Sequence, residues 1–574
     1  YIAGWRPTDI DFEVVNWAAP AAALFFEGRA SDYEIAPSVE ARRTFVVKRG
    51  DLLAYQDDVE SGVGSDPFSR FVKALDIPAA PTRRLRPAAE PADTSVPDSP
   101  EASTEDDVPP VDDPLVLEPV ARELGERAAD LRAASAVFAV MGMPKTGHMS
   151  TILPTMQPEQ YQLVSWPADR PLIVQGQPGT GKTVIAAHRA AYLTSRERDI
   201  DRIARIAIVG PSDHYVEHIH PVLAEVKERD ANIRALSLSA WLQNVVGLKS
   251  TPKPGRAGWI ETSWDMGRIL DDYVRMMPSK PAAKRIDFQV REVVDRLRLA
   301  TTSEIASSDH REWLNSLPSW SEIISQDRFL PVLATIALAL RPSSAGDLVG
   351  HLIVDEAQDV RPIEWRLLTR SLLEPGRQMS LFGDINQRRS DWTASDWTKL
   401  AVDLEITDEE GSANVQELET GYRSTRQILR YANRLLPRGT RGERALRDGP
   451  EPRVLAAKPQ DRVAAVCREA AALCERHEGL VALISNHPTP ASNEFRRLSW
   501  TRGRFQHSWL KNGRTVIVLH PDQARGLEFD AAVVDEPAEF PENVGRQGVL
   551  YTSLTRANKE LTVVHSAQLP KELR

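Results

Sequence analysis

Cysteine is nearly absent from this chain: its 574 residues include only Cys467 and Cys474. The two lie seven positions apart in a stretch with helical spacing, which places them on one face but about 10 Å apart along the helix axis, too far for a disulfide. Two cysteines alone also make no metal site. We therefore expect two buried thiols, and we exclude a disulfide-stapled domain.

Long hydrophobic runs are missing as well. No apolar stretch approaches the roughly 20 residues that span a bilayer, and the first residues, YIAGWRPTDI, lack the charged-then-apolar order of a signal peptide. We expect a cytoplasmic, monomeric protein with no membrane partner. A hydrophobic content of 42% over this length suffices for several domain-sized cores.

The chain also has no excess of positive charge, its net charge being −10. Nine acidic residues fall between Glu90 and Asp113, where no Lys or Arg occurs, so the remainder is nearly neutral and neither supports nor excludes a polyanionic partner. Residues 78–113 are rich in Pro, Ala, Ser and acidic residues, which predicts a disordered acidic linker. A nucleic-acid mimic that docks on a basic partner surface is the alternative.

The most informative motif in the chain is residues 171–183, PLIVQGQPGTGKT. A β-favouring run leads into the G-x-x-x-x-G-K-T pattern, and a helical segment follows. Glycines at these positions allow backbone N–H groups at a helix N-terminus to approach a phosphate closely, while Lys182 adds a point charge and Thr183 a hydroxyl for Mg²⁺. An ordinary strand-to-helix turn does not require all four fixed positions. We predict an ATP site formed by Gly176, Gln177, Pro178, Gly179, Thr180, Gly181, Lys182 and Thr183.

Two later strand ends carry polar residues suited to phosphoryl transfer. In HLIVDEAQD, Asp355 is placed to hold Mg²⁺ and Glu356 to orient and deprotonate the attacking water. In LFGDINQ, Gln387 follows another short strand, where it either senses the γ-phosphate or caps a turn.

Two arginines far downstream are candidates for completing this site. Arg423 lies next to Tyr422 in LETGYRST, and Arg556 lies in LYTSLTRA. Arginines from a second lobe stabilise the charge on a transferring phosphoryl group when the lobes close. A surface salt bridge is the ordinary alternative for any single arginine.

Apolar strand patterns alternate with helical ones along most of the chain, which predicts parallel sheets with ligands at the carboxyl ends of the strands. The expected strands cover residues 206–209, 352–354, 380–382, 481–484, 516–519, 532–534 and 561–564. Residues 239–347 break this alternation with helical patterns and five tryptophans, and we interpret them as a helical insertion. Near the N-terminus, β-like runs cover residues 12–16, 44–48 and 52–55, and residues 115–140 have helical spacing.

Together these motifs resemble the UvrD-like superfamily 1 helicases and translocases. The resemblance implies an α/β fold of two RecA-like lobes that bind ATP and Mg²⁺ between them. It also implies that Gln160 reads adenine, Tyr422 stacks on it, and Gly526 and Glu528 of GLEFD lie at the nucleotide. The catalytic set implied is Lys182, Glu356, Gln387, Arg423 and Arg556, with Thr183 and Asp355 as metal ligands. Trp392, five positions after Gln387, falls where these enzymes stack a base of single-stranded nucleic acid; a buried core tryptophan is the alternative.

A narrower resemblance is to the HelD-type ATPases, which remodel and recycle RNA polymerase. It rests on TGHMSTILPTMQPEQ, IVGPSDHYVEHIHPVL, HLIVDEAQDVRPIEWRLL, GLEFDAAVVDEPAEF and LYTSLTRANKELTVVHS. The segment FEVVNWAAPAAALFFEGRA is similar to that family's DWRAP…FY element, with Asn16 and Ala18 replacing its Asp and Arg. The family's coiled-coil arm is not among the printed residues, and the span from Arg423 to Gly526 is too short for the accessory domain of true UvrD helicases.

We therefore expect four regions: an N-terminal β segment packed on the first lobe (1–77), the linker (78–113), the first lobe with its insertion (114–403) and the second lobe (404–574). Three functions remain open. The first is an ATP-driven motor that releases core RNA polymerase from nucleic acid. The second is a translocase or helicase on single-stranded DNA or RNA, and the third is a nucleotide-switched adaptor without motor activity.

Overall fold

The structure is a computed structural model. It describes residues 2–5, 12–27, 31–32, 41–48, 51–59, 137 and 155–574, with gaps at 254, 256, 343–347, 374–377, 409–410, 437–444, 504–506 and 542–543. The expected acidic linker and most of the expected helix at 115–140 lie outside the described residues.

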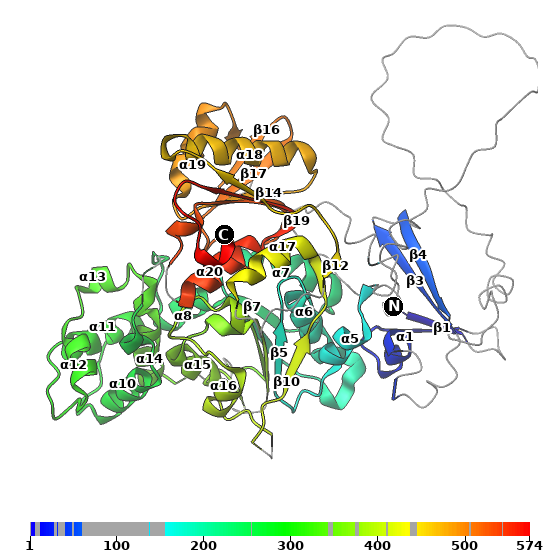
Figure 1. Cartoon of the computed structure of the whole chain (residues 1–574). Helices are drawn as coiled ribbons and strands as arrows, with labels where there is room; N and C mark the ends of the chain where they lie inside the picture. The colour runs from blue at the N-terminus through cyan, green and yellow to red at the C-terminus, as the bar shows by residue number, and fades with distance from the viewer. Residues whose placement is uncertain are drawn as a thin grey trace, which may run out of the picture.

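A six-stranded parallel sheet forms the first lobe, below the second in Figure 1. In spatial order its strands are β10 (Val415–Leu418), β5 (Leu172–Gly176), β9 (Met379–Gly383), β8 (His351–Asp355), β6 (Ile206–Gly210) and β7 (Ile233–Ser237). The inner strands are runs of buried aliphatic residues, as expected of a parallel sheet covered on both faces. The covering helices are α5 (Pro158–Ser165), α6 (Lys182–Leu193), α7 (Asp213–Val226), α15 (Pro362–Thr369) and α16 (Trp397–Asp403).

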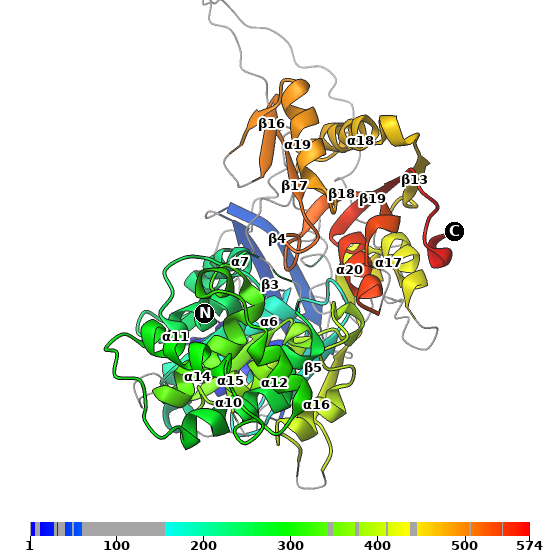
Figure 2. The ribbon, with the colours of Figure 1, turned by 90° about the vertical axis from the view of Figure 1, so that its left-hand side faces the viewer.

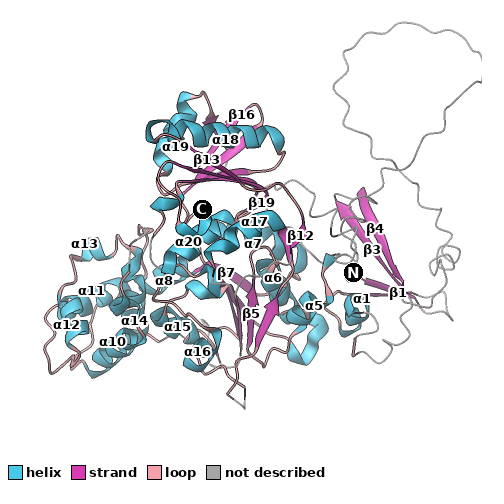
Figure 3. Cartoon of the chain, in the orientation of Figure 1, coloured by secondary structure: helices cyan, strands magenta, loops and turns pink. Residues whose placement is uncertain are grey.

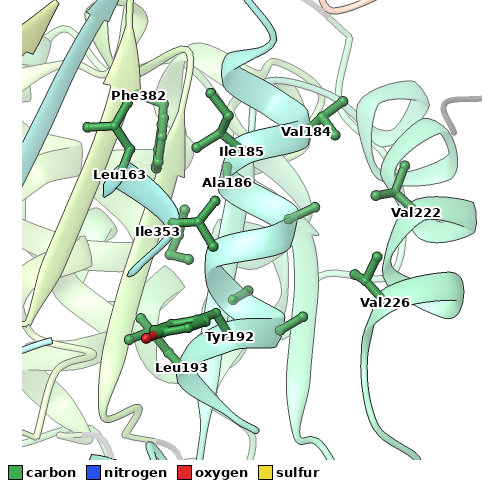
Figure 4. Packing of buried hydrophobic residues seen from close by; sticks show 14 of the residues in the cluster. Leu163, Val184, Ile185, Ala186, Tyr192, Leu193, Val222, Val226, Ile353 and Phe382 are labelled. Carbon is green, nitrogen blue, oxygen red and sulfur yellow. The ribbon is translucent and has the colours of Figure 1, made fainter. Parts of the chain in front are cut away.

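Helix α6 is held in place by packing on nearly all sides. Val184, Ile185 and Ala186 in its first turns are buried, and Ile353 and Phe382 of the sheet and Val222 of α7 belong to the same core (Figure 4). Each large aliphatic side chain buried in this way contributes about 1.5–3 kcal/mol. The phosphate loop at the start of α6 therefore rests on a rigid support.

The expected insertion is helical and follows β7 (Figure 3). Its helices are α8 (Leu238–Val246), α9 (Trp259–Thr262), α10 (Trp264–Met276), α11 (Ile286–Leu297), α12 (Ser308–Asn315), α13 (Trp320–Ile323) and α14 (Leu330–Leu340). They enclose a separate core that also includes Ile363 and Leu367 of α15. The insertion is therefore packed directly on the helix that follows the Asp355–Glu356 pair.

A mixed seven-stranded sheet forms the second lobe, with β13 (Arg453–Ala456), β19 (Ala557–His565), β18 (Phe529–Asp535), β14 (Val481–Ile484), β17 (Arg514–Leu519), β16 (Ser508–Lys511) and β15 (Thr501–Arg502) in spatial order. The first five are parallel, and the last two are antiparallel additions at one edge. Its helices are α17 (Arg426–Ala432), α18 (Arg462–Arg476), α19 (Pro488–Arg497) and α20 (Val544–Leu554). Figure 2 shows this lobe above the first from a second direction.

The chain crosses between the lobes later than the sequence suggested. The expected boundary follows Asp403, but β10 at residues 415–418 pairs with β5 in the first sheet. The next strand, β11 (Gly421–Thr425), pairs instead with β12 (Ala445–Arg447). The crossover therefore falls between Leu418 and Gly421, directly before Tyr422 and Arg423.

The N-terminal segment touches the first lobe through aromatic side chains. A short turn, η1 (Pro20–Ala22), and α1 (Ala23–Glu27) bring Trp17 and Phe26 onto α5 and α6. Phe26 stacks on Tyr161 with ring centroids 4.4 Å apart, and Trp17 meets His188 edge-on at 5.8 Å. The strands form two antiparallel pairs: β1 (Ile2–Trp5) with β2 (Phe12–Val15), and β3 (Ala41–Lys48) with β4 (Asp51–Val59).

Both cysteines are buried free thiols on α18, as expected. Burial raises the pKa of each thiol to about 12, so both stay protonated at pH 8. A thiol reagent such as DTNB should therefore leave the native protein unmodified at pH 8 and modify both cysteines in denaturant. Rapid reaction of either one without denaturant would contradict its burial.

Within the described ranges, no helix is both long and apolar enough to cross a membrane.

Candidate functional site

The phosphate loop has the backbone that its glycines allow. Gly179 and Gly181 have φ of +82° and +89°, a region that disfavours other residues, and α6 begins immediately afterwards. The Lys182 Nζ donates to the backbone carbonyls of Gly176 and Gln177 at 2.6 and 3.1 Å. The loop therefore already holds its lysine beside a helix N-terminus, where an anion is favoured.

The two carboxylates stand beside this loop at the end of β8. Asp355 is buried, and one of its oxygens accepts from the Glu356 backbone N–H at 2.9 Å. The other oxygen, Oδ2, has no hydrogen-bond partner among the described residues. Burial, and then the charge of Glu356, raises the pKa of Asp355 to about 6, while the neighbouring Thr183 hydroxyl and the charge of Lys182 oppose the shift.

A divalent cation fits this arrangement. An unpaired buried carboxylate oxygen next to a threonine hydroxyl is a ligand set that Mg²⁺ accepts, and a bound cation relieves the cost of the buried charge. Thr183 and Asp355 are thus the described residues that would hold Mg²⁺, together with phosphate oxygens and water.

Glu356 has an unusual backbone conformation and a lowered pKa. Its φ of +53° is rare for a residue with a side chain and is typical of strained functional positions. Burial alone would raise the pKa of Glu356, but Lys182 and Arg556 outweigh it and the net shift is downward. The carboxylate is therefore ionised at neutral pH.

Residues of the second lobe close the opposite side of the same cleft. Arg556 is buried, and its Nη2 donates to the Gln387 Oε1 of the first lobe at 3.2 Å. Arg423 forms an ion pair with Glu528. The cleft is lined by Pro178, Gly179, Gly181, Lys182, Thr183, Glu356, Gln387, Arg423, Ser424, Gly526, Glu528, Thr555, Arg556 and Asn558.

The cleft is narrow. Its volume is about 40 Å³, against the 300–1,000 Å³ of typical ligand pockets. The lobes must part to admit a nucleotide, and the Arg423–Glu528 pair must separate if each residue is to contact it.

Gln387 belongs to a hydrogen-bond chain that crosses the first lobe. Its Nε2 donates to Asp384 Oδ2 at 2.9 Å, and Gln175, on the strand before the phosphate loop, donates to Asp384 Oδ1 at 2.8 Å. Because Gln387 also accepts from Arg556, the chain connects β5 to the second lobe. The γ-phosphate-sensing role of Gln387 stays a prediction. Gln175 and Asp384 were not predicted, although both lie within the quoted motifs.

The remaining predicted residues lie at the margins of the cleft or away from it. Gln160 is buried and donates to the Thr180 carbonyl at 3.4 Å, and the Tyr422 hydroxyl donates to the neighbouring Glu159 at 3.0 Å. These contacts bring the two expected adenine-binding residues to one side of the loop. Trp392 lies apart, 41% exposed, in a hollow of about 380 Å³ between the insertion and the first lobe.

Ser424, Thr555 and Asn558 also line the cleft and were not predicted. Each lies within two positions of a predicted arginine, in LETGYRST or LYTSLTRAN. Proximity to those arginines was the only available signal, since serine, threonine and asparagine are common at turns for other reasons.

Ion pairs beside the cleft also join the lobes. Arg525 of the second lobe pairs with Asp359 at 2.6 Å, and Asp522 pairs with Arg389 of the first lobe at 2.6 Å. Asp359 additionally accepts from the Arg389 backbone N–H. The described conformation is therefore a closed one, with polar contacts flanking the nucleotide cleft.

Comparison with known proteins adds two findings on sequence. A family model described as an AAA domain matches residues 160–392, which run from Gln160 to Trp392. The ATP-dependent DNA helicase PcrA of Bacillus subtilis (strain 168) is 22% identical over 314 residues, covering 50% of this chain and 40% of that protein. The matched region is therefore about two fifths of the relative's length.

One of the similar solved structures is the C-terminal domain of a possible DNA helicase from Lactobacillus plantarum WCFS1, with a TM-score of 0.22 and 22% identity, covering 26% of this chain and 91% of that one. A TM-score this low does not establish a shared fold. The chain is therefore similar to an AAA-domain family model over residues 160–392 and, at low identity, to the helicase PcrA.

Proposed function

We propose that this protein hydrolyses ATP between its two lobes. Glu356 accepts the proton of the attacking water, and Lys182, Arg423 and Arg556 stabilise the charge that develops on the transferring phosphoryl group. Thr183 and Asp355 would hold Mg²⁺, which would supply positive charge against the phosphate oxygens. Gln387 positions Arg556 and senses whether a γ-phosphate is present.

The observation that carries this proposal is that Lys182 and Arg556 line one cleft although they come from different lobes. A surface arginine would face solvent or a local carboxylate. Arg556 instead reaches across the lobe boundary to Gln387, beside the phosphate loop. ATPase assays with and without Mg²⁺ test the proposal: Mg²⁺-dependent turnover supports it, and no turnover under any partner condition overturns it.

We further propose what ATP hydrolysis drives. Motion of the lobes moves the insertion as a lever against RNA polymerase and releases the polymerase from nucleic acid. The supporting contact is at Asp271 of α10, which is nearly buried and accepts from both Arg366 and Arg370 of α15. Because α15 follows the Asp355–Glu356 pair, a shift at the nucleotide is transmitted to the insertion through a charged joint.

Asp271→Ala should uncouple polymerase release from ATP hydrolysis. The substitution leaves two arginines without their carboxylate and loosens the joint, but it does not reach the cleft. We expect basal kcat within about twofold of wild type and at least a tenfold loss of polymerase release, measured by displacement of labelled nucleic acid from core polymerase.

Asp272→Ala on the same helix is the matched control, because Asp272 forms an ion pair only with the exposed Arg275 among the described residues. It should release polymerase like the wild type. Equal release by both variants would contradict the role of the joint.

A single-strand translocase is the second candidate, and the Trp392 hollow supports it. Three tryptophans from two parts of the chain line this hollow: Trp259 and Trp264 of the insertion, and Trp392 of the first lobe. Exposed aromatic faces stack on bases without sequence preference and contribute about 1–3 kcal/mol per base.

A pull-down from cell extract with and without nuclease, followed by ATPase assays, distinguishes these outputs. Core polymerase that co-purifies despite nuclease supports the lever. Strong, salt-sensitive stimulation by single-stranded DNA supports the translocase. Slow hydrolysis that is indifferent to both partners leaves the nucleotide-switched adaptor.

A further inference from the structure

Gln358 is a buried residue beside the Asp355–Glu356 pair to which the proposed reaction gives no role. It lies in the short turn η7 (Ala357–Asp359), directly after this pair, and is 1% exposed. Its Nε2 donates to the Glu356 Oε2 at 2.7 Å, and its Oε1 accepts from the Asp384 backbone N–H at 3.0 Å. Both ends of the amide are therefore engaged, one by the proposed base and the other by the loop after β9.

The two partners admit only one orientation of this amide. If the amide were reversed, an oxygen would face the carboxylate and an N–H would face an N–H. Gly383 also leaves the space that the amide fills, since a Cβ added there would lie 2.5 Å from the Gln358 Oε1. The amide is therefore fixed by its surroundings, and it can fix the carboxylate in turn.

The Glu356 carboxylate needs a contact of this kind. A φ of +53° describes the backbone of Glu356, but several rotatable side-chain bonds still decide where the carboxylate points. The hydrogen bond from Gln358 occupies Oε2. The other oxygen then remains to accept from a water in the cleft, which Glu356 lines.

The Asp–Glu pair at the end of β18 is held differently. Ala538 stands there at the position that corresponds to Gln358. The Glu536 Oε2 accepts instead from Arg462 at 2.9 Å and from Ser566. The carboxylate outside the nucleotide cleft is thus held in an ion pair, whereas the one that lines the cleft is held by a neutral amide, which orients it without adding a charge.

We propose that Gln358 is a positioning residue that orients the Glu356 carboxylate toward the attacking water. The inference rests on the proposed function, because it requires Glu356 to act as the base. Asp384, which holds the other end of the amide, also accepts from Gln387, and Gln387 accepts from Arg556. The orientation of the base is therefore tied to the loop that the second lobe contacts in the closed state.

Gln358→Met tests the inference in the full chain, because it keeps the length of the side chain and removes the amide. A displacement of about 1 Å at a catalytic group costs about a hundredfold in rate, so we expect kcat to fall between about tenfold and a hundredfold. The KM for ATP and the affinity for ADP should stay within about threefold of wild type, because the amide contacts the base and not the nucleotide. Steady-state phosphate release and ADP titration measure these values.

Two further variants separate positioning from a merely structural role. In the Glu356→Gln background, which lacks the base, adding Gln358→Met should change the residual kcat by less than about twofold. Gln358→Glu keeps the oxygen that accepts from Asp384 but sets a carboxylate against Glu356, and it should lose as much activity as Gln358→Met. This variant serves the same test if the methionine variant does not fold.

Gln289→Met is the matched control. The Gln289 amide of α11 donates to the carbonyls of Pro281 and Ala283 at 3.3 and 2.7 Å, within the insertion. This variant should hydrolyse ATP like the wild type. Wild-type kcat in Gln358→Met, or an equal loss with and without Glu356, overturns the inference and leaves the proposed function standing. A wild type without Mg²⁺-dependent turnover overturns both.

Discussion

Arg556→Ala should lower the kcat of ATP hydrolysis at least a thousandfold. An arginine supplied across a cleft to a transferring phosphoryl group is worth about 10³–10⁵ in rate, because its charge acts mainly on the transition state. Arg556 is buried and already reaches the first lobe at Gln387. Steady-state phosphate release measures the effect, and ADP binding should change by less than tenfold.

Two further variants separate the effect of Arg556 on the reaction from its effect on the folding of the second lobe. Arg556 also donates to the carbonyls of Thr552 and Leu527, so its loss affects the second lobe as well. Arg556→Lys keeps a positive charge without the planar fork, and we expect at least a hundredfold loss at near-native stability. Arg476→Ala, which removes an exposed pair with Glu560, is the control and should retain full activity. Activity of Arg556→Lys within tenfold of wild type would remove Arg556 from the reaction.

Gly548→Ala should block lobe closure. Gly548 lies on α20 of the second lobe, and a Cβ there would lie 1.7 Å from the Arg388 carbonyl oxygen of the first. Backbone cannot yield by that much, so the lobes must separate and carry Arg556 away from Gln387. A displacement of about 1 Å at a catalytic group costs about a hundredfold in rate. We expect kcat to fall at least a hundredfold.

The thermal stability of Gly548→Ala should not fall with its activity. Alanine is favoured over glycine within a helix by about 1 kcal/mol, so the unfolding temperature should stay the same or rise. Gly513→Ala, in the hairpin between β16 and β17, is the control: its φ of +74° makes alanine strained, but the added methyl meets nothing within 4 Å. An active Gly548→Ala enzyme would mean that the closed arrangement is not the one that hydrolyses ATP.

Most of the predicted residues line one candidate cleft, and they could be found in the sequence because their motifs are local. The backbone of the phosphate loop depends on glycines within a few positions, and the Asp355–Glu356 pair directly follows a buried strand. Parallel sheets then bring such strand ends to one edge, which is why residues 200 positions apart share a cleft.

An Asp–Glu pair after a strand does not by itself identify the carboxylates of the nucleotide cleft. Asp535 and Glu536 follow β18 in the second lobe, and Glu536 has a positive φ of 48° like that of Glu356. Arg462 pairs with both carboxylates at 3.4 and 2.9 Å, which makes this second pair a structural ion cluster. Only the upstream phosphate loop distinguished the two pairs in the sequence.

The missed features depend on contacts that no local pattern encodes. Strand β10 reads VQEL, a short polar segment without the apolar run of a buried strand, and it joins the first sheet only because β5 offers an open edge. The Asp271 joint and the Trp392 hollow require the insertion to be packed against α15.

The most direct test of the account is the distance between the lobes in each nucleotide state. Because the native cysteines are buried, spin labels on cysteines introduced at the exposed Asp169 and Glu475 would report one lobe each. Using Glu356→Gln to trap bound ATP, we expect pulsed electron double resonance to give distinct distance distributions without nucleotide, with Mg²⁺-ADP and with Mg²⁺-ATP. Identical distributions in all three states, with ATP bound, would contradict a nucleotide-driven clamp.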